Sequence, residues 1–275
     1  MSPTGEQPTR EVAVVIGTGG MGQAIARREG CGRRLVLADF DTASLERFAD
    51  VLRDEGFDVT TAEVDVADRA SVASVAALAD GLGPITRLVH TAGVSPIQAP
   101  ASTILAVDLL GTAFVLAEFE RVVAAGGAGV VISSMSGHFA RLNAEDERAL
   151  AVTPAEELLE LPVVAAVDDP KAAYPLSKRA NQLRVQAAAT TWGARGARIN
   201  SISPGVISTP MARQELASEH GDRMRTMIDS SGAGRIGTTT DIADAASFLL
   251  GPAASFITGT DLLVDGGVVA ATRQF

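Results

Sequence analysis

The sequence predicts an α/β fold in which one parallel sheet is covered by helices on both faces. Strand-like apolar runs alternate with helical segments, and the connections between them are short. This alternation is typical of repeated strand–helix–strand units, which build parallel sheets. The length of 275 residues suits one large domain, and 47% hydrophobic with only 4% aromatic residues predicts an aliphatic core.

The first half of the chain contains four predicted strands, each followed by a helix. The first strand, EVAVVI, is a short apolar run rich in β-branched residues, which is the pattern of a buried strand. The strands are Glu11–Ile16, Arg34–Ala38, Asp58–Val64 and Ile85–Thr91. The helices that follow them are Gln23–Glu29, Thr42–Glu55, Arg69–Leu82 and a long apolar one over Thr103–Ala124.

The second half continues the alternation but contains one interruption. Three further strands and two helices are predicted: strands Gly129–Ser133, Arg198–Ser203 and Asp261–Val264, and helices Asp169–Ala194 and Thr240–Leu250. The stretch 138–170 carries no strand signal and contains a short predicted helix, Pro154–Leu161, with acids in its first turn. We interpret it as an insertion that forms a lid or pocket wall, a subunit contact or a surface excursion. Residues 1–10 are expected to be a flexible tail, and 11–275 the single catalytic domain.

The first predicted strand runs directly into a glycine-rich loop that opens a helix. The loop reads Gly17-Thr18-Gly19-Gly20-Met21-Gly22. Glycines at this spacing permit a tight turn and let the backbone approach a pyrophosphate, which the free N–H groups of the helix N-terminus then hold. The loop therefore predicts a dinucleotide site, and a ligand-free glycine turn is the alternative.

An acid at the end of the second strand indicates which dinucleotide is bound. Asp39 lies 22 residues after Gly17. A carboxylate at this offset accepts hydrogen bonds from the adenosine ribose hydroxyls and repels a 2′-phosphate. The loop contains no Arg or Lys that would neutralise such a phosphate. We therefore expect NAD(H) to be preferred over NADP(H).

The only tyrosine, Tyr174, lies four residues before Lys178, one of only two lysines in the chain. Both fall on a predicted helix, where side chains at i and i+4 share a face. A phenol has a pKa of about 10, and a neighbouring cation lowers it. This pair predicts a proton donor and acceptor. The alternative is a tyrosine at the edge of the core beside a solvated lysine.

Together these motifs resemble the short-chain dehydrogenase/reductase family in its smaller, single-domain form, and the resemblance covers nearly the whole chain. Besides the glycine loop, the matching motifs are Asp65-Val66, Ala92-Gly93, Ile132-Ser133-Ser134, Tyr174 to Lys178, Asn200 to Gly205, Thr209-Pro210, Ile257 to Gly259 and Val264 to Gly267. The resemblance implies a Rossmann-type doubly wound sheet. It also implies that Tyr174 is the general acid/base, that Lys178 lowers its pKa and holds the nicotinamide ribose, and that Ser134 bonds the substrate oxygen.

The resemblance also assigns residues to the cofactor. Asp65 and Val66 would flank the adenine, and Thr209 would lie near the nicotinamide carboxamide. The remaining cofactor residues implied are the glycine loop Gly17, Thr18, Gly19, Gly20, Met21 and Gly22, with Asp39, Thr91, Ala92, Gly93, Tyr174, Lys178, Pro204, Gly205 and Val206.

The chain departs from the family pattern at several positions. The glycine loop is one residue shorter, and His90-Thr91 replaces a pair of asparagines before Ala92-Gly93. Asp108 stands where the family has the helical asparagine that holds a relay water, so it is a candidate fourth catalytic residue. Ser134 and Tyr174 are 40 positions apart, a larger spacing than is usual. This enlargement resembles a bacterial hydroxysteroid dehydrogenase/carbonyl reductase branch. Ser133 or Ser136 are the serines most easily confused with Ser134.

These features predict an NAD(H)-dependent oxidoreductase that interconverts a secondary alcohol and a ketone. An apolar substrate, such as a steroid, terpenoid or lipid-derived ketone, is expected because the stretch 207–237 carries Met211, Leu216, Met224, Met227 and Ile228. Helix packing is the alternative role for these side chains. The alternative function is a redox sensor that binds NAD(H) without turnover.

Composition limits the partners and the compartment. A net charge of −10 argues against nucleic acid, and the histidines have no metal-ligand spacing, so no metal site is predicted. We expect no apolar stretch of about 18 residues and hence no membrane span. One cysteine, Cys31, and an N-terminus without an apolar signal core favour the cytoplasm. The family resemblance implies a homodimer or homotetramer built on the helices that contain Tyr174 and Thr103–Ala124.

Overall fold

A computed structural model describes residues 10–217 and 221–273, so most of the expected N-terminal tail lies outside the described residues. The molecule is built on a seven-stranded sheet in the order β3-β2-β1-β4-β5-β6-β7. All strand pairs are parallel. The strands are β1 Val12–Ile16, β2 Arg34–Asp39, β3 Asp58–Glu63, β4 Ile85–His90, β5 Val123–Ile132, β6 Arg198–Pro204 and β7 Asp261–Val264. The predicted fold class is confirmed.

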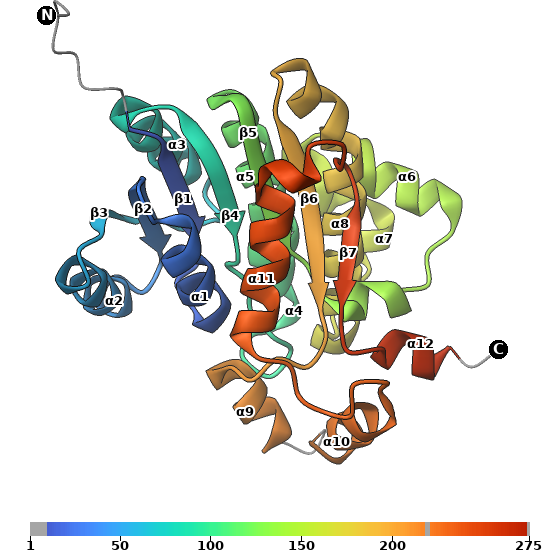
Figure 1. Ribbon diagram of the computed structural model, residues 1–275. Coiled ribbons are helices and arrows are strands. Elements are labelled where there is room, and N and C mark those ends of the chain that lie inside the picture. The colour runs from blue at the N-terminus through green and yellow to red at the C-terminus, as the bar shows by residue number, and fades with distance from the viewer. Residues whose placement is uncertain (1–9, 218–220, 274–275) are drawn as a thin grey trace, which may run out of the picture.

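Helices cover both faces of the sheet, as predicted (Figure 1). On one face are α1 Gly20–Glu29, α2 Thr42–Asp54 and α11 Thr239–Leu250. On the other are α3 Arg69–Leu82, α4 Ala101–Ile104, the π-helix η1 Leu105–Leu110, α5 Gly111–Glu120 and α8 Pro170–Ala194. The short elements are η2 Met135–Phe139, α6 Ala144–Val152, η3 Ala155–Glu160, α7 Pro162–Ala165, α9 Pro210–Leu216, α10 Gly221–Ser230, η4 Pro252–Ala254 and α12 Val268–Thr272.

The first strand shows how the two cores form. Side chains alternate across a strand. Val12, Val14 and Ile16 therefore pack against α3, α5 and α8, whereas Ala13 and Val15 pack against α1, α2 and α11. All of β1 is buried. The strand β1 thus lies between two aliphatic layers, and the loop at its carboxyl end is held by a rigid frame.

The stretch from Ala101 to Glu120 corrects one expectation. It is a continuous helix of 20 residues that is long and apolar enough to cross a membrane. The expectation that no such stretch exists was wrong, but 67% of it is buried inside the protein, so it is a core helix. It ends before the predicted Ala124, because β5 already begins at Val123.

The stretch between Ser134 and Tyr174 packs against helix α8. Its helices α6, η3 and α7 bury Leu150, Leu158 and Val164 in the core shared with α8. Arg184 of α8 donates hydrogen bonds to the carbonyl oxygens of Leu150 and Thr153 at 3.1 and 2.9 Å. The stretch therefore covers α8, one of the two helices on which the family resemblance places a subunit interface.

Candidate active site and cofactor crevice

The glycine loop joins β1 to α1 at the carboxyl edge of the sheet. Gly17 has φ +94°, which L side chains rarely adopt. A Cβ at Gly22 would overlap the carbonyl oxygen of Gly17, so the turn closes only without side chains there. A Cβ at Gly19 would meet only open space. Because α1 begins at Gly20, its first N–H groups lie at this edge, where an anion is stabilised.

Thr18 and Asp39 connect the loop to the end of β2. Asp39 Oδ2 accepts hydrogen bonds from Thr18 N at 2.5 Å and from Thr18 Oγ1 at 2.8 Å. Thr18 is buried, so its side chain supports the loop from the side that faces away from the crevice. Among the predicted cofactor residues of the loop, Thr18 alone does not line the crevice, whereas Asp39 both fixes the loop and borders the cavity.

A crevice of about 770 Å³ runs along the carboxyl ends of β1, β2 and β4. It brings together most of the predicted cofactor residues from separate loops. These are Gly17, Gly19, Gly20, Met21, Gly22, Asp39, Asp65, Val66, Thr91, Ala92, Gly93 and Thr209. The crevice also contains Phe40, which sequence reasoning missed and which is 71% exposed.

The residues after β4 brace the glycine loop. Thr91 Oγ1 donates to the carbonyl oxygen of Gly17 at 2.7 Å, and the N–H groups of Thr91 and Ala92 donate to that of Ile16. The substitution of His90-Thr91 for a pair of asparagines therefore keeps a backbone-bracing role. Gly93 is required for another reason, because a Cβ there would lie 3.1 Å from Lys178 Nζ.

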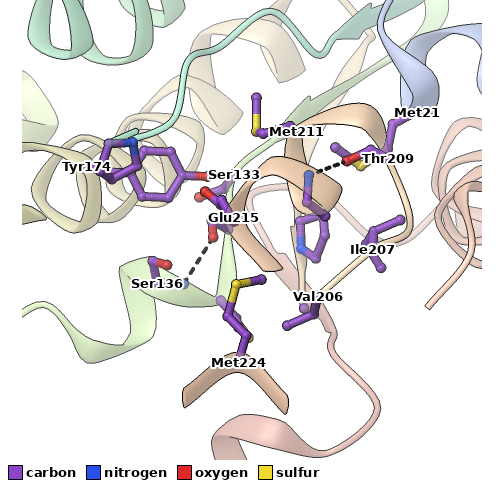
Figure 2. Close-up of a pocket in the computed structure, with 16 residues that line it drawn as sticks. Met21, Ser133, Ser136, Tyr174, Val206, Ile207, Thr209, Met211, Glu215 and Met224 are labelled. Carbon is purple, nitrogen blue, oxygen red and sulfur yellow. Dashed lines mark hydrogen bonds between the residues drawn. The ribbon is translucent and has the colours of Figure 1, made fainter. Parts of the chain in front are cut away.

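A second cavity, of about 200 Å³, adjoins the crevice at Met21 and Thr209 and contains the predicted catalytic hydroxyls. Its lining includes Ser134, Tyr174, Pro204, Gly205, Val206 and Thr209. Thr209 Oγ1 accepts a hydrogen bond from Ala212 N at 3.1 Å and so caps α9 (Figure 2).

Two serines flank the catalytic position in different ways. Ser133 Oγ donates to the carbonyl oxygen of Lys178 at 2.8 Å and is committed to holding α8. Ser134 Oγ accepts from Ser136 N at 3.1 Å and lines the smaller cavity together with Tyr174. Of the three serines considered from sequence, Ser134 is the one whose hydroxyl lowers the pKa of the Tyr174 phenol.

Burial raises the pKa of Tyr174 above its ordinary value. The nearby Lys178 ammonium opposes this, whereas the charge of Asp108 adds to it. Lys178 Nζ lies 5.2 Å from the centre of the Tyr174 ring. Without a cationic ligand nearby, the phenol is therefore protonated at neutral pH and is a proton donor.

Asp108 forms a buried ion pair with Lys178. Its Oδ2 lies 3.0 Å from Lys178 Nζ, and its Oδ1 accepts a hydrogen bond from Val94 N at 2.8 Å. Asp108 is 0% and Lys178 4% exposed. Burial alone would lower the pKa of Lys178, but the charges of Asp108 and Tyr174 outweigh it and raise that pKa. Lys178 is therefore a fixed ammonium.

The π-helix η1 places Asp108 at this position. Single π turns inside α-helices are rare and occur frequently at functional sites. Thr112 Oγ1 donates to the carbonyl oxygen of Asp108 at 2.8 Å, and His90 Nε2 lies 3.2 Å from the same hydroxyl. Burial lowers the pKa of His90 to about 3. His90 is therefore neutral, and since the Thr112 hydrogen is already used, Nε2 carries the proton.

Methionines dominate the walls around Tyr174. Five of the six methionines in the chain line the crevice or the two cavities at Tyr174, and the sixth is Met1. They are Met21, Met135, Met211, Met224 and Met227. Met211, Met224 and Met227 were predicted from sequence to form the substrate pocket and Met21 to contact the cofactor, whereas Leu216 and Ile228 do not border these cavities. Thioether side chains fill irregular space and adapt to different apolar shapes.

No group of three or more His, Cys, Asp or Glu side chains within residues 10–217 and 221–273 is arranged to hold a metal ion. Sequence reasoning also missed Met135 and Glu215, which border the cavities at Tyr174. No sequence signal marks them, because each comes to Tyr174 only through the tertiary fold.

Comparison with known proteins agrees with this site. A family model described as enoyl-(acyl carrier protein) reductase matches residues 15–151 and 163–269. A short-chain dehydrogenase/reductase of Alternaria brassicicola, bsc3, is 40% identical over 265 residues, covering 95% of this chain and 97% of the relative. The chain belongs to the short-chain dehydrogenase/reductase family. As a member, it is an oxidoreductase of alcohols and ketones, and such enzymes generally use nicotinamide cofactors.

Other family members show the breadth of named substrates. Galactitol 2-dehydrogenase of Cereibacter sphaeroides is 32% identical and covers 93% of each chain. A 3-alpha-hydroxysteroid dehydrogenase/carbonyl reductase of Comamonas testosteroni is 31% identical, covering 79% of this chain and 87% of that one. A solved family structure from Brucella melitensis, titled glucose/ribitol dehydrogenase, superposes with a TM-score of 0.75 at 26% identity, covering 96% and 98% of the two chains.

Proposed function

We propose that this family member is an NAD(H)-dependent oxidoreductase that interconverts a secondary alcohol and a ketone on a largely apolar substrate. The observation that carries the proposal is that Ser134 and Tyr174 line the same methionine-lined cavity, which adjoins the glycine-loop crevice. A carbonyl oxygen at these hydroxyls would receive two hydrogen-bond donors. This arrangement suits acid–base chemistry at one carbon–oxygen bond.

The residues of the crevice fit a dinucleotide. Gly19 leaves open space at the N-terminus of α1, where the pyrophosphate would lie. Asp39 would bond the adenosine ribose, Asp65 and Val66 would border the adenine, and Gly93 leaves room beside Lys178 for the second ribose. When bound, the nicotinamide accepts or supplies the hydride.

The proton is handled by the protein's own groups. During reduction, Tyr174 donates its phenolic proton to the carbonyl oxygen, while the Ser134 hydroxyl donates a hydrogen bond that stabilises the negative charge developing there. During oxidation, the phenolate accepts the proton from the alcohol. Lys178 stabilises that phenolate, and Asp108 holds Lys178 in place by a contact of 3.0 Å.

The choice of cofactor is tested first by titrating the protein with NADH and NADPH and following nicotinamide fluorescence. We expect NADH to bind at least tenfold more tightly, because the Asp39 carboxylate repels a 2′-phosphate. Asp39→Asn should reduce this preference about fivefold or more. Asp54→Asn, an exposed charge change on α2, should keep it. Equal binding of the two cofactors by the unaltered protein would contradict the proposed preference.

The serine assignment has its own test. Ser134→Ala should lower kcat about 10- to 100-fold, the range expected for losing one hydrogen bond to a charged group. Ser136→Ala, which keeps the backbone N–H that Ser134 accepts, should change kcat less than threefold. Steady-state kinetics on one alcohol measure both. A larger loss in the Ser136 variant would show that the roles are reversed.

One observation favours the alternative of an NAD(H)-binding redox sensor. Asp108 balances the Lys178 charge that would otherwise favour the Tyr174 phenolate. Tight NADH binding without turnover of any alcohol or ketone would support this alternative. The intact set of Ser134, Tyr174 and Lys178 supports the enzyme.

We further propose a cytoplasmic homodimer or homotetramer. Its interface would use the part of α8 after Val185, where Gln186, Ala187, Thr190 and Thr191 are exposed, because α6 and its neighbours cover the preceding part of the helix.

A further inference from the structure

Among residues 10–217 and 221–273, one carboxylate borders the two cavities at Tyr174, and it belongs to Glu215 of α9. The cavity of about 200 Å³ that contains Ser134 meets a second cavity of about 490 Å³. The residues that border both are Pro96, Met135, Ser136, Tyr174, Glu215 and Met224. Glu215 therefore stands at the junction of the two cavities, where the reacting carbon of a substrate must lie.

The position of Glu215 is tied to Tyr174. Both side chains border the same two cavities, and the charge of Glu215 raises the pKa of the Tyr174 phenol. In Figure 2 the Glu215 side chain lies on the same side of the cavity as the Tyr174 hydroxyl. The cap that Thr209 provides to α9 fixes the start of the helix that carries Glu215.

The chemistry of a carboxylate limits what can lie beside it. An ionised carboxylate only accepts hydrogen bonds, and its two oxygens have about four acceptor positions, so an existing contact leaves capacity for another donor. The other groups shared by the two cavities are apolar apart from Ser136 and Tyr174. A hydroxyl on the substrate could donate to the carboxylate, which a purely apolar ketone cannot do. Lys171 also borders the larger cavity, so the two opposite charges of the lining favour neither an anionic nor a cationic substrate.

We propose that Glu215 selects neutral substrates with a second hydroxyl on the carbon next to the reacting one. These are diols, or the corresponding hydroxyketones, on an apolar frame that the methionines surround. The inference rests on the proposed alcohol–ketone activity and specifies its substrate class. Glu215 is a specificity-determining residue in this scheme, since it bonds the neighbouring hydroxyl and takes no part in proton or hydride transfer.

The test compares matched pairs of alcohols with NAD⁺ in excess. The pairs are cyclohexanol with trans-cyclohexane-1,2-diol, and indan-1-ol with trans-indane-1,2-diol. We expect kcat/KM to be at least about tenfold higher for the diol of each pair, as a hydrogen bond to a charged group provides. Glu215→Gln and Glu215→Ala should bring this ratio to within about threefold of one. The change should appear mainly in KM, because the second hydroxyl is bound alike before and during the reaction.

A matched control and distinct outcomes keep the inference separate from the proposed function. Gln214→Ala alters the exposed neighbour of Glu215 on α9 and should preserve the diol preference. Unchanged NADH affinity shows that each variant is folded. Equal rates on both members of each pair, or a preference that survives in both Glu215 variants, would overturn the role of Glu215 and leave the proposed function intact. NADH binding with no oxidation of any of the alcohols would overturn the proposed function itself.

Discussion

Replacing Tyr174 with phenylalanine is expected to lower kcat by about 10³-fold or more while leaving NADH binding within a few-fold of the unaltered protein. General acid–base catalysis contributes about 10²–10⁴-fold. Tyr174 is also the only tyrosine in the chain, so no second phenol can replace it. Stopped-flow oxidation of an alcohol, together with an NADH titration, measures the two effects.

The phenylalanine variant separates chemistry from structure because the ring can remain while the hydroxyl is lost. The melting temperature is the control, and it should change little. A residual rate above about a tenth of the original would show that another group transfers the proton. Trp192 is a poor reporter in this experiment, since it is fully buried on α8 against Gly129 of β5 and away from the cavities at Tyr174.

Changes at Asp108 are expected to have the second-largest effect, and two variants separate its roles. Asp108→Ala should destabilise the protein by about 3–5 kcal/mol, because it leaves the Lys178 ammonium buried without its partner. Asp108→Asn keeps an oxygen that can accept from Val94 N and removes the charge. Chemical denaturation measures the first effect, and the pH dependence of kcat/KM for alcohol oxidation measures the second.

The direction of the pH effect follows from the charges around Tyr174. Asp108 and Glu215 raise the pKa of the phenol, and Lys178 lowers it; His90 is neutral. Removing the Asp108 charge therefore lowers that pKa. Oxidation needs the phenolate, so its rate should reach a plateau at a lower pH in this variant. Reduction, which needs the phenol, should decline at a correspondingly lower pH.

A buried acid elsewhere supplies the control for this pH profile. Glu118 is 7% exposed and pairs with Arg69 at 2.7 Å on α5, away from Tyr174. Glu118→Gln should reduce stability without moving the profile. An Asp108→Asn profile that coincides with that of the unaltered protein would mean that Asp108 only holds Lys178 in position.

Much of the fold could be predicted because its signals are local. Short apolar runs that end at glycine, proline, serine or an acid placed all seven strands, and α3 and β7 begin and end at the residues predicted. The helix α6, Ala144–Val152, was missed because its first turns are charged and it buries only Leu150, so it has no apolar stripe. The extension of β5 back to Val123 was missed because it passes through Gly126, at φ +81°, and such irregular strands lack an apolar pattern.

The parts of the site that could be predicted are those whose residues form a motif within one segment of the chain. The glycine loop, Asp39 and the pair Tyr174 and Lys178 each depend on spacing along the chain. The ion pair of Asp108 with Lys178 depends instead on a π turn and on distance across 70 residues. Glu215 is similar, since only the cavity that it borders shows that it belongs to the site. Local pattern thus predicts the backbone frame of the site, and tertiary packing determines its charges.

The enclosure of α8 has a consequence for how the enzyme behaves on dilution. From Ala173 to Val185 this helix is buried on nearly all sides, against the sheet and against segments of its own chain. The orientation of Tyr174 and Lys178 is therefore fixed during the folding of a single polypeptide. Specific activity should therefore be the same at nanomolar as at micromolar protein concentration, whatever the number of subunits. The Ser134 and Tyr174 hydroxyls are positioned without the association of a second subunit.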